Sequence, residues 1–332
     1  MATTVTKTIK SSGGDYTSLS AWEAAQQGDL TGIRDEIAQA ECYKFLDTTA
    51  VDITGWTTDA TRYIRIYTPT AERHAGYLVT DGSAYCLQAP AASAQCLRDR
   101  QAFTRIEGLI LDGVNCTNGR VLHAGYTVAG NQYSYNVIKG IAANSIGIEF
   151  DQGVAGNYYV FNNIIYDSFR GVLMYTGTYY IENNTVVDCG QGIRGVVAAQ
   201  TYNLTNNISF NNSGGDFLQS AGTFVATYNS SSDATADDWG GAGNLINKNS
   251  STNFIDYANN KFGITSADTT QWKNLGTATV VGGYTDDIIG TTRDASWDIG
   301  AYEVAQAAGV TTEYVGPIYA QGHSPMIGRR YV

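Results

Sequence analysis

Four polar side chains in the middle of the sequence could do chemistry together. They are two carboxylates, a phenol and a guanidinium: Glu149, Asp151, Tyr175 and Arg194. Two carboxylates at i and i+2 of one strand lie roughly 6.5–7 Å apart, which is compatible with inverting glycoside hydrolysis. The phenol could support a sugar ring, and the guanidinium could pair with a uronate or act as a lyase base. The competing interpretation is an ordinary solvated face on which charges alternate with apolar residues.

The elements that would position these side chains follow from an asparagine repeat. All 23 asparagines lie between Asn115 and Asn274, and pairs begin at Asn162, Asn183 and Asn206, at spacings of 21 and 23 residues. A period in the low twenties is typical of stacked supersecondary units. The runs around the pairs are rich in Tyr, Val, Ile and Thr and lack a leucine-rich pattern or a helical period. Each repeat therefore predicts short strands with polar corners, one turn of a parallel coil.

Asparagine suits such a corner because it tolerates the left-handed conformation and bonds its own backbone. Stacked at one corner of successive turns, asparagine side chains can bond along the axis as a ladder. We therefore predict a structural ladder through Asn162, Asn183 and Asn206.

Strand alternation places the residues that follow three aligned glycines, Gly147, Gly171 and Gly192. The side chains expected to point inward are Ile148, Phe150, Val172, Met174 and Ile193. Those expected to point outward are Glu149, Asp151, Leu173, Tyr175, Arg194 and Val196. Because successive coils lie about 4.8 Å apart, one external face should carry the two carboxylates, the tyrosine and the arginine within about 10 Å.

The repeat and two further sequences resemble the right-handed parallel β-helix superfamily, the pectate-lyase-like solenoids. DIGAYE at residues 298–303 resembles the closing strand of many members, and GGDYTSLSAWEAAQQ at residues 13–27 resembles their entry cap. The latter contains a capping box, Ser20 to Glu23, that would begin a short helix over the first coil. The resemblance implies an all-β fold: a single-stranded right-handed parallel β-helix solenoid with a short N-terminal capping helix and an extended C-terminal arm. This fold carries lyases, hydrolases, viral spikes and inert scaffolds, so it does not specify a function.

The chain divides into three predicted parts. Residues 1–50 are a cap with an opening strand, and residues 51–303 are the β-helix, with regular coils over about 103–226 and a long loop at 230–251. Residues 304–332 have no asparagine and no repeat. They are too apolar for a solvated linker and too short for a domain.

We expect this C-terminal arm to dock on the solenoid or, through Arg329 and Arg330, on a protein partner in an assembly. It could also cover the far end of the solenoid, because exposed strand edges invite edge-to-edge growth.

Two aspartates, Asp167 and Asp188, occupy equivalent corners, four residues before Gly171 and Gly192. Lyases that the chain resembles often bind calcium through aspartates on neighbouring coils, and hard cations favour such oxygen clusters. The same corners admit Asx turns that need no metal. No cofactor is required by any motif, and Ca²⁺ is the ion that this pair could take. In the long loop, Trp239 is the tryptophan expected to contact a glycan.

Composition excludes several classes of protein. The net charge of −11 argues against a nucleic-acid partner, and it would repel an anionic polysaccharide unless a local basic groove or bound cations intervened. No apolar run approaches the roughly 18–20 residues of a spanning helix, so no membrane partner is expected. The five cysteines lack a CxxC motif and predict buried free thiols, with a Cys86–Cys96 pair as the alternative.

Two functional hypotheses remain. The first is a non-catalytic surface or assembly protein, a virus-particle structural component such as a head decoration or tail accessory protein, that could contact glycans. The N-terminus lacks the apolar region of a signal peptide, yet the Tyr- and Asn-rich surface resembles proteins outside cells, so an extracellular or virion-associated location is expected.

The alternative is a polysaccharide lyase or glycoside hydrolase of the β-helix type. Few basic residues fall in the regular coils, chiefly Lys139, Arg170 and Arg194, and this counts against it. A glycan-binding module without turnover would share the same face, and a homo-oligomer is compatible with either hypothesis.

Overall fold

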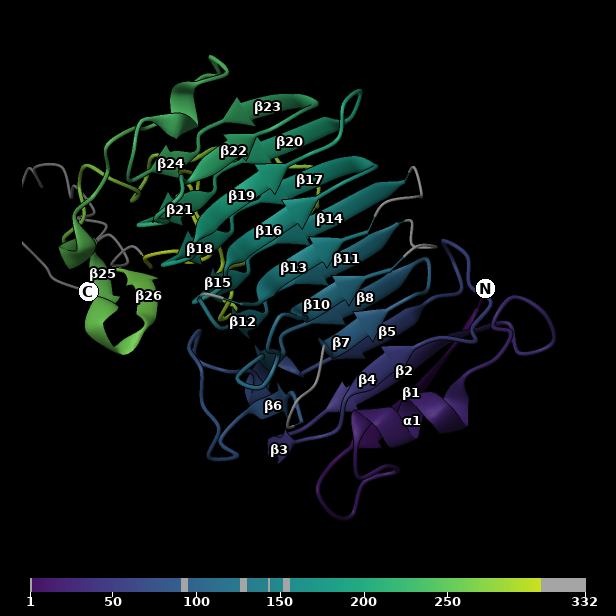
Figure 1. Cartoon of the computed structure of the whole chain (residues 1–332). Helices are drawn as coiled ribbons and strands as arrows, with labels where there is room; N and C mark the ends of the chain where they lie inside the picture. The colour runs from purple at the N-terminus through teal and green to yellow at the C-terminus, as the bar shows by residue number, and fades with distance from the viewer. Residues whose placement is uncertain (1, 91–94, 126–129, 143, 152–155, 306–332) are drawn as a thin grey trace, which may run out of the picture.

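The chain coils into a parallel β-solenoid, seen side-on in Figure 1. The computed structural model describes residues 2–90, 95–125, 130–142, 144–151 and 156–305. Three sheets of nine, eight and seven parallel strands run along the axis, and a regular coil contributes one strand to each in turn. We name them sheet 1, sheet 2 and sheet 3 in that order. The all-β solenoid expected from the repeat is confirmed.

The strands of the three sheets alternate along the chain. Sheet 1 contains β1 (Thr3–Ile9), β2 (Glu36–Cys42), β5 (Ile64–Tyr67), β8 (Thr104–Glu107), β11 (Asn131–Ser134), β14 (Asn157–Phe161), β17 (Thr178–Glu182), β20 (Thr201–Thr205) and β23 (Thr223–Thr227). Sheet 2 contains β3 (Phe45–Asp47), β6 (Tyr85–Gln88), β9 (Ile110–Asp112), β12 (Val137–Lys139), β15 (Ile164–Tyr166), β18 (Thr185–Val187), β21 (Ile208–Phe210) and β24 (Ser230–Ser231). Sheet 3 contains β4 (Val51–Ile53), β7 (Gln95–Asp99), β10 (Arg120–Ala124), β13 (Ile146–Phe150), β16 (Arg170–Met174), β19 (Gln191–Gly195) and β22 (Phe217–Gln219).

A few elements lie outside the coils. They are the helix α1 (Leu19–Gln26), an antiparallel pair β25 (Phe254–Asp256) and β26 (Lys261–Ile264), and the short 3₁₀ turns η1 (Thr70–Glu72), η2 (Thr235–Asp237), η3 (Ser251–Asn253) and η4 (Tyr257–Asn259). No helix in the described part of the chain is long and apolar enough to cross a membrane.

The core confirms the strand alternation predicted from the aligned glycines. The five side chains expected to point inward are at most 1% exposed: Ile148, Phe150, Val172, Met174 and Ile193. Ile148, Val172 and Ile193 are register partners on successive coils, so they stack in one column.

The aligned glycines themselves lie against the backbone of the next coil. A Cβ added at Gly147 would lie 2.6 Å from a carbonyl oxygen, and one at Gly192 would lie 2.2 Å from another. Only a residue without a side chain allows the coils to approach so closely.

A continuous asparagine ladder stabilises the corner between sheet 1 and sheet 2. Its members are completely buried: Asn136, Asn163, Asn184, Asn207 and Asn229. The Oδ1 of each of the last four accepts hydrogen bonds of 2.9–3.0 Å from the backbone N–H and the Nδ2 of the asparagine one coil earlier. Because each rung satisfies a backbone donor that would otherwise be buried without a partner, the ladder fixes the turn of each coil that it joins.

The ladder lies one residue later than the sequence analysis placed it. Asn162, Asn183 and Asn206 are the corner residues, with left-handed φ values of 53, 50 and 57°. Among them only one rung forms, from Asn206 Nδ2 to Asn183 Oδ1 at 3.0 Å. The left-handed turn directs the first side chain of each pair outward, so the second one points into the stack.

Helix α1 packs against the first coils, and its N-cap lies two residues before the N-cap of the predicted capping box. Its N-cap is Ser18, whose Oγ accepts a hydrogen bond of 3.1 Å from the backbone N–H of Ala21. Glu23 was expected to form a capping box with Ser20. Its carboxylate instead accepts a hydrogen bond of 3.1 Å from Trp56 Nε1. Packing of the helix onto the coil that contains β4 therefore overrides the local capping pattern.

The other end of the solenoid is covered by the loop at 232–247. Trp239 packs on Phe224 at the end of the core, with ring centroids 4.5 Å apart. Asn244 Oδ1 accepts a hydrogen bond of 2.9 Å from the backbone N–H of Asn229 and so extends the ladder by one position. This loop covers the end that the C-terminal arm was expected to cover.

Residues 276–304, which we call the strap, run back along the outside of the sheet 1–sheet 2 corner. The N–H of Thr277 donates to Asn206 Oδ1 at 2.9 Å, and the Tyr284 hydroxyl donates to Asn183 Oδ1 at 3.0 Å. Further along, Tyr302 donates to the carbonyl of Ala75 at 2.7 Å. The strap therefore crosses from the late coils to the early ones.

The DIGAYE sequence lies in the strap and is not the closing strand that the resemblance implied. Residues 298–303 form no strand, because their carboxylates bond the main chain of the strap itself. Ile299 and Ala301 are buried against the outer side of sheet 2.

The remaining predictions concern the cysteines, the N-terminal cap and the C-terminal arm. All five cysteines are buried and free, Cys86 and Cys96 included, which confirms the thiol prediction. β1 pairs along its whole length with β2, so residues 1–50 already contain coil strands in addition to the cap. Of the predicted arm, residues 306–332 with Arg329 and Arg330 lie outside the described residues.

Candidate functional site

The outer side of sheet 3 carries the polar side chains that the sequence analysis singled out. Glu149, Leu173 and Arg194 are register partners on β13, β16 and β19, so they form one outward column. Asp151 and Tyr175 follow two residues after the first two members of that column. Figure 1 shows how these three strands lie side by side in the middle of the solenoid.

Three further side chains belong to this outer side and were missed from the sequence. Arg98 and His123 extend the column of Glu149 onto β7 and β10, and Arg120 lies in a neighbouring column with Arg170. We call the set of Arg98, Arg120, His123, Glu149, Asp151, Arg170, Tyr175 and Arg194 the arginine face. The predicted shortage of convergent basic residues is therefore wrong for this surface.

The two carboxylates of the arginine face already have partners. Arg120 Nε forms an ion pair with Glu149 Oε2, and the Glu149 side chain is only 4% exposed. This hydrogen bond raises the pKa of Arg120 above its ordinary value. Asp151 Oδ2 lies 2.9 Å from His123 Nε2.

His123 is buried, and burial lowers the pKa of its imidazole even though Asp151 opposes the shift. The neutral ring is assigned with Nε2–H donating to Asp151, because that carboxylate can only accept. The other nitrogen, Nδ1, is buried and has no hydrogen-bond partner among the residues that the structure describes. A ligand cannot reach Nδ1 unless the neighbouring side chains move.

Arg170 and Arg194 present a different situation, because they converge on one neutral amide. Gln191 Oε1 accepts from Arg170 Nε at 2.9 Å and from Arg194 Nη1 at 2.8 Å. Neither guanidinium forms an ion pair with any residue that the structure describes. Burial and the adjacent Arg194 charge lower the pKa of Arg170. Two like charges are thus held together without a counterion.

The two predicted glycan-contacting aromatics lie in different places. Tyr175 is partly exposed, and its pKa is raised by burial and by the nearby Glu149 carboxylate, which places it within the field of the arginine face. Trp239 packs at the end of the core and does not belong to this face.

The predicted metal pair, Asp167 and Asp188, lies at the corner between sheet 2 and sheet 3, where both residues are left-handed with φ of 52 and 53°. Asp188 Oδ1 accepts hydrogen bonds from Asn211 Nδ2 at 2.6 Å and from the hydroxyl of Tyr257. Burial and the Asp188 charge raise the pKa of Asp167, against the attraction of Lys139. In the described parts of the chain, no group of three or more His, Cys, Asp or Glu residues could hold a metal ion. The calcium site at this pair stays a prediction.

These partners decide which chemistry the arginine face is prepared for. Inverting hydrolysis needs one carboxyl group that can donate a proton and one that can activate water. Here Glu149 is held by a guanidinium and Asp151 by an imidazole. Arg170 and Arg194 have no ion-pair partner among the described residues, so the binding of an anion is the chemistry that the geometry supports best.

No protein-family model, no curated protein and no solved structure matches the chain.

Proposed function

We propose that this protein is a non-catalytic surface or assembly protein that binds an acidic glycan on its arginine face. In the same proposal the protein is a structural component of a virus particle, such as a head decoration or tail accessory protein. It is also related by descent to the pectate-lyase-like solenoids. The observation that carries the binding function is the pair Arg170 and Arg194, which share Gln191 and form no ion pair within the described parts of the chain.

Local charge supports binding of an acidic ligand to a protein of net charge −11. The arginine face has four guanidiniums and two carboxylates, and burial keeps His123 neutral. Charges farther away than about 8 Å are largely screened at physiological ionic strength, so a ligand on this face responds mainly to the local excess of positive charge. Guanidinium forks bind carboxylates and sulfates with two parallel hydrogen bonds.

The proposal includes no cleavage of the glycan, because the carboxylates of the arginine face are already paired. The Glu149 side chain is nearly inaccessible and paired with Arg120, so it is poorly placed to protonate a leaving group. The solenoid, whose middle and late turns are fixed by buried asparagines, is well suited to present a surface on a particle.

The test is binding of uronate, sulfated and neutral oligosaccharides, measured by calorimetry at two salt concentrations. We expect binding of acidic ligands that weakens with salt and falls at least about tenfold in Arg170→Ala and in Arg194→Ala. Arg62→Ala is the matched control, because Arg62 pairs with Asp35 and Asp59 on the early coils. Binding that is absent for all acidic ligands, or equal in Arg194→Ala, would remove the proposal.

A polysaccharide lyase or glycoside hydrolase is the second candidate, and the contact between His123 and Asp151 favours it. Such a pair could take a proton from a substrate if the ring nitrogen became accessible. The panel should therefore also be incubated with the protein, with and without calcium, while chain length and new unsaturated ends are followed. Cleavage that His123→Gln abolishes would establish the enzyme. Without cleavage of any ligand that binds, the non-catalytic proposal stands.

A further inference from the structure

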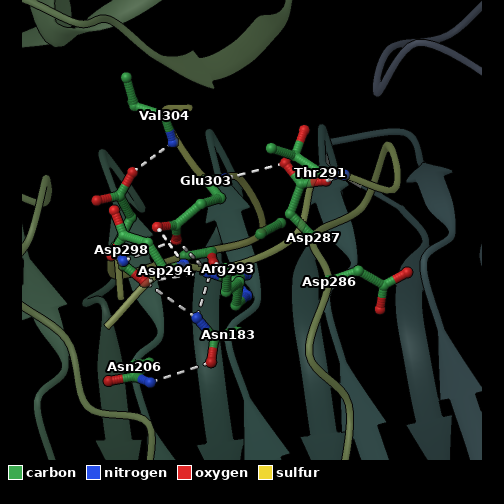
Figure 2. Close-up of polar contacts among 12 residues, drawn as sticks. Asn183, Asn206, Asp286, Asp287, Thr291, Arg293, Asp294, Asp298, Glu303 and Val304 are labelled. Carbon is green, nitrogen blue, oxygen red and sulfur yellow. Dashed lines mark hydrogen bonds and ion pairs between the residues drawn. The ribbon is translucent and has the colours of Figure 1, made fainter. Parts of the chain in front are cut away.

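The strap is fastened by three of its own carboxylates, which surround one arginine. Figure 2 shows Arg293 at the centre, with Glu303, Asp298 and Asp287 around it. Glu303 Oε2 accepts from Arg293 Nη1 at 3.1 Å and from the backbone N–H of Asp298 at 3.0 Å. The two oxygens of Asp298 accept from the N–H groups of Asn274 and Val304, at 2.7 and 2.6 Å.

Asp287 completes this cluster from a neighbouring turn of the strap. Its Oδ1 accepts from the N–H of Thr291 at 2.6 Å, and its Oδ2 accepts from the N–H of Glu303 at 3.0 Å. The carboxylates therefore hold distant parts of the strap together through backbone donors.

The same arginine joins the strap to the solenoid. Arg293 Nη2 donates to Asn162 Oδ1 at 2.7 Å and to the carbonyl of Gly300 at 3.0 Å. Beside it, Asn183 Nδ2 donates to the carbonyls of Asp298 and Gly300, at 3.1 and 3.0 Å. If the cluster around Arg293 is disturbed, the contacts with the left-handed asparagine corner are disturbed with it.

The charges in the cluster do not balance. Arg293, Glu303, Asp287 and Asp298 are 6, 5, 0 and 0% exposed, so one buried guanidinium faces three buried carboxyl groups. Among the three carboxyl groups, the Arg293 guanidinium pairs only with that of Glu303, and it also donates to the backbone carbonyl of Asp298. Both oxygens of Asp287 and of Asp298 accept from backbone N–H groups at 2.6–3.0 Å. Within the described residues, Glu303 Oε1 accepts only from the N–H of Asp294, at 3.5 Å, so it is the carboxyl oxygen best able to carry a proton. An ionised carboxylate away from water costs several kcal/mol unless it is paired, so the closed cluster favours keeping a proton.

We propose that the strap is a pH-dependent clasp, held shut by a proton that Glu303 retains in this cluster and loosened from the solenoid when that proton is lost. Burial raises the pKa of Glu303 to about 7, and the nearby Asp298 charge adds to the shift. Burial also raises the pKa values of Asp287 and Asp298.

The charge of Arg293 opposes the rise in the pKa values of Asp287 and Asp298, but neither carboxylate forms an ion pair with any residue that the structure describes. From sheet 1, Glu182 accepts from the strap N–H groups of Val281 and Gly282, and burial raises its pKa too. Arg73 lies over the ring of Tyr135, whose hydroxyl donates to Asp286. The other titratable groups on or against the strap are Asp294, Tyr284 and Tyr302.

The direction of the pH effect follows from the two states of Glu303. In the open strap its carboxyl group titrates near the ordinary value of about 4.3, whereas in the closed strap it keeps its proton up to about 7. The stabilisation is therefore fully present below the ordinary value and is lost as pH rises through about 7. With one proton involved, the ratio of closed to open strap should fall about tenfold for each pH unit between about 4.3 and about 7, and it should level off at higher pH, where both states have lost the proton.

Hydrogen exchange of the full-length protein between about pH 4.5 and 9 tests the clasp, with rates corrected for the intrinsic pH dependence of exchange. We expect the protection of amides in 276–304 to fall about tenfold per unit from about pH 4.5 to about 7 and to level off above it, while amides of β14, β17 and β20 keep theirs. Glu303→Gln should remove the slope, because Gln can still accept from Arg293. Asp294→Asn, a partly exposed strap carboxylate, is the matched control and should keep the wild-type profile.

A flat profile in the wild-type protein would overturn the proposal without any variant, so it can be decided even if Glu303→Gln does not fold. A slope that persists in Glu303→Gln, or vanishes in Asp294→Asn, would also overturn it by assigning the titration to another group. The clasp does not rest on glycan binding, so failure of either proposal leaves the other unaffected.

Discussion

The corner between sheet 1 and sheet 2 and the arginine face of sheet 3 use polar side chains in opposite ways. At the corner, every asparagine of the ladder is buried and bonded to the coils on either side. On the arginine face, Arg170 and Arg194 are partly exposed and share one amide acceptor. The difference shows that partners, more than residue type or repeat position, distinguish a side chain that completes the fold from one that is left for a ligand.

The largest effect should come from removing a ladder residue. Asn184→Ala leaves the backbone N–H of Asn163 and the carbonyl of Val160 without partners in the core. We expect the free energy of unfolding to fall by about 3–5 kcal/mol, measured by denaturant unfolding. Asn203→Ala, on the outer side of β20, is the control and should cost about 0.5 kcal/mol. An equal loss of stability in the two variants would show that the buried ladder asparagines do not stabilise the corner more than an outward-facing asparagine does.

A smaller loss is expected at the corner residue that contacts the strap. Asn183→Ala removes the bonds to Asp298 and Gly300 and places alanine at a φ of 50°. The cost should be about 2 kcal/mol, because water can replace these partners when the strap opens. Asn183→Gly removes the same side chain without backbone strain. Its free energy of unfolding should therefore be about 1 kcal/mol higher than that of Asn183→Ala. Identical unfolding curves for both variants would argue against strain at this position.

An intermediate case is the ion pair on the arginine face. Glu149→Gln leaves Arg120, 34% exposed, without its carboxylate, and should cost about 1 kcal/mol in thermal unfolding. At the same time the face gains one positive charge, so acidic ligands should bind more tightly. Weaker binding in this variant would show that Glu149 contacts the ligand directly, which would favour the enzyme.

The smallest effect on stability is expected for Arg194→Ala. Its bonds go to Ser220 and Gln191, which water can reach, so the free energy of unfolding should change by less than about 0.5 kcal/mol. A melting temperature within error of the wild type, together with lost binding, would sharpen the contrast with the ladder. A large loss of stability would instead place Arg194 among the residues that complete the fold.

The core of the regular coils and the outward neighbours could be predicted from the sequence. Ile148, Val172 and Ile193 follow aligned glycines at nearly constant spacing, and strand alternation then separates inner from outer side chains. Arg98, Arg120 and His123 were missed because the coils that carry them do not repeat visibly. The register partners Leu97, Leu122 and Ile148 are 25 and 26 residues apart, in segments of unlike sequence.

Adjacent residues of the same type could not be told apart. Either asparagine of the pair at Asn183 and Asn184 could enter the ladder, and the choice depends on which one adopts the left-handed conformation. Ser18 and Ser20 could each cap α1, and the choice depends on Glu23 packing against Trp56. These are differences of one or two positions that a repeat of about twenty residues does not resolve.

By itself the sequence determined the features that repeat: short strands, polar corners, the inner and outer sides of each coil, and hence a solenoid. These depend on local conformation and on contacts with the next coil, which recur at a regular distance along the chain. Only the tertiary structure decided how the strap returns along the coils. Arg293 meets Asn162 across 131 residues, and Glu303 is buried beside it because the strap folds back on itself. Such contacts leave no period in the sequence, since each is made once, between segments that only the completed solenoid brings together.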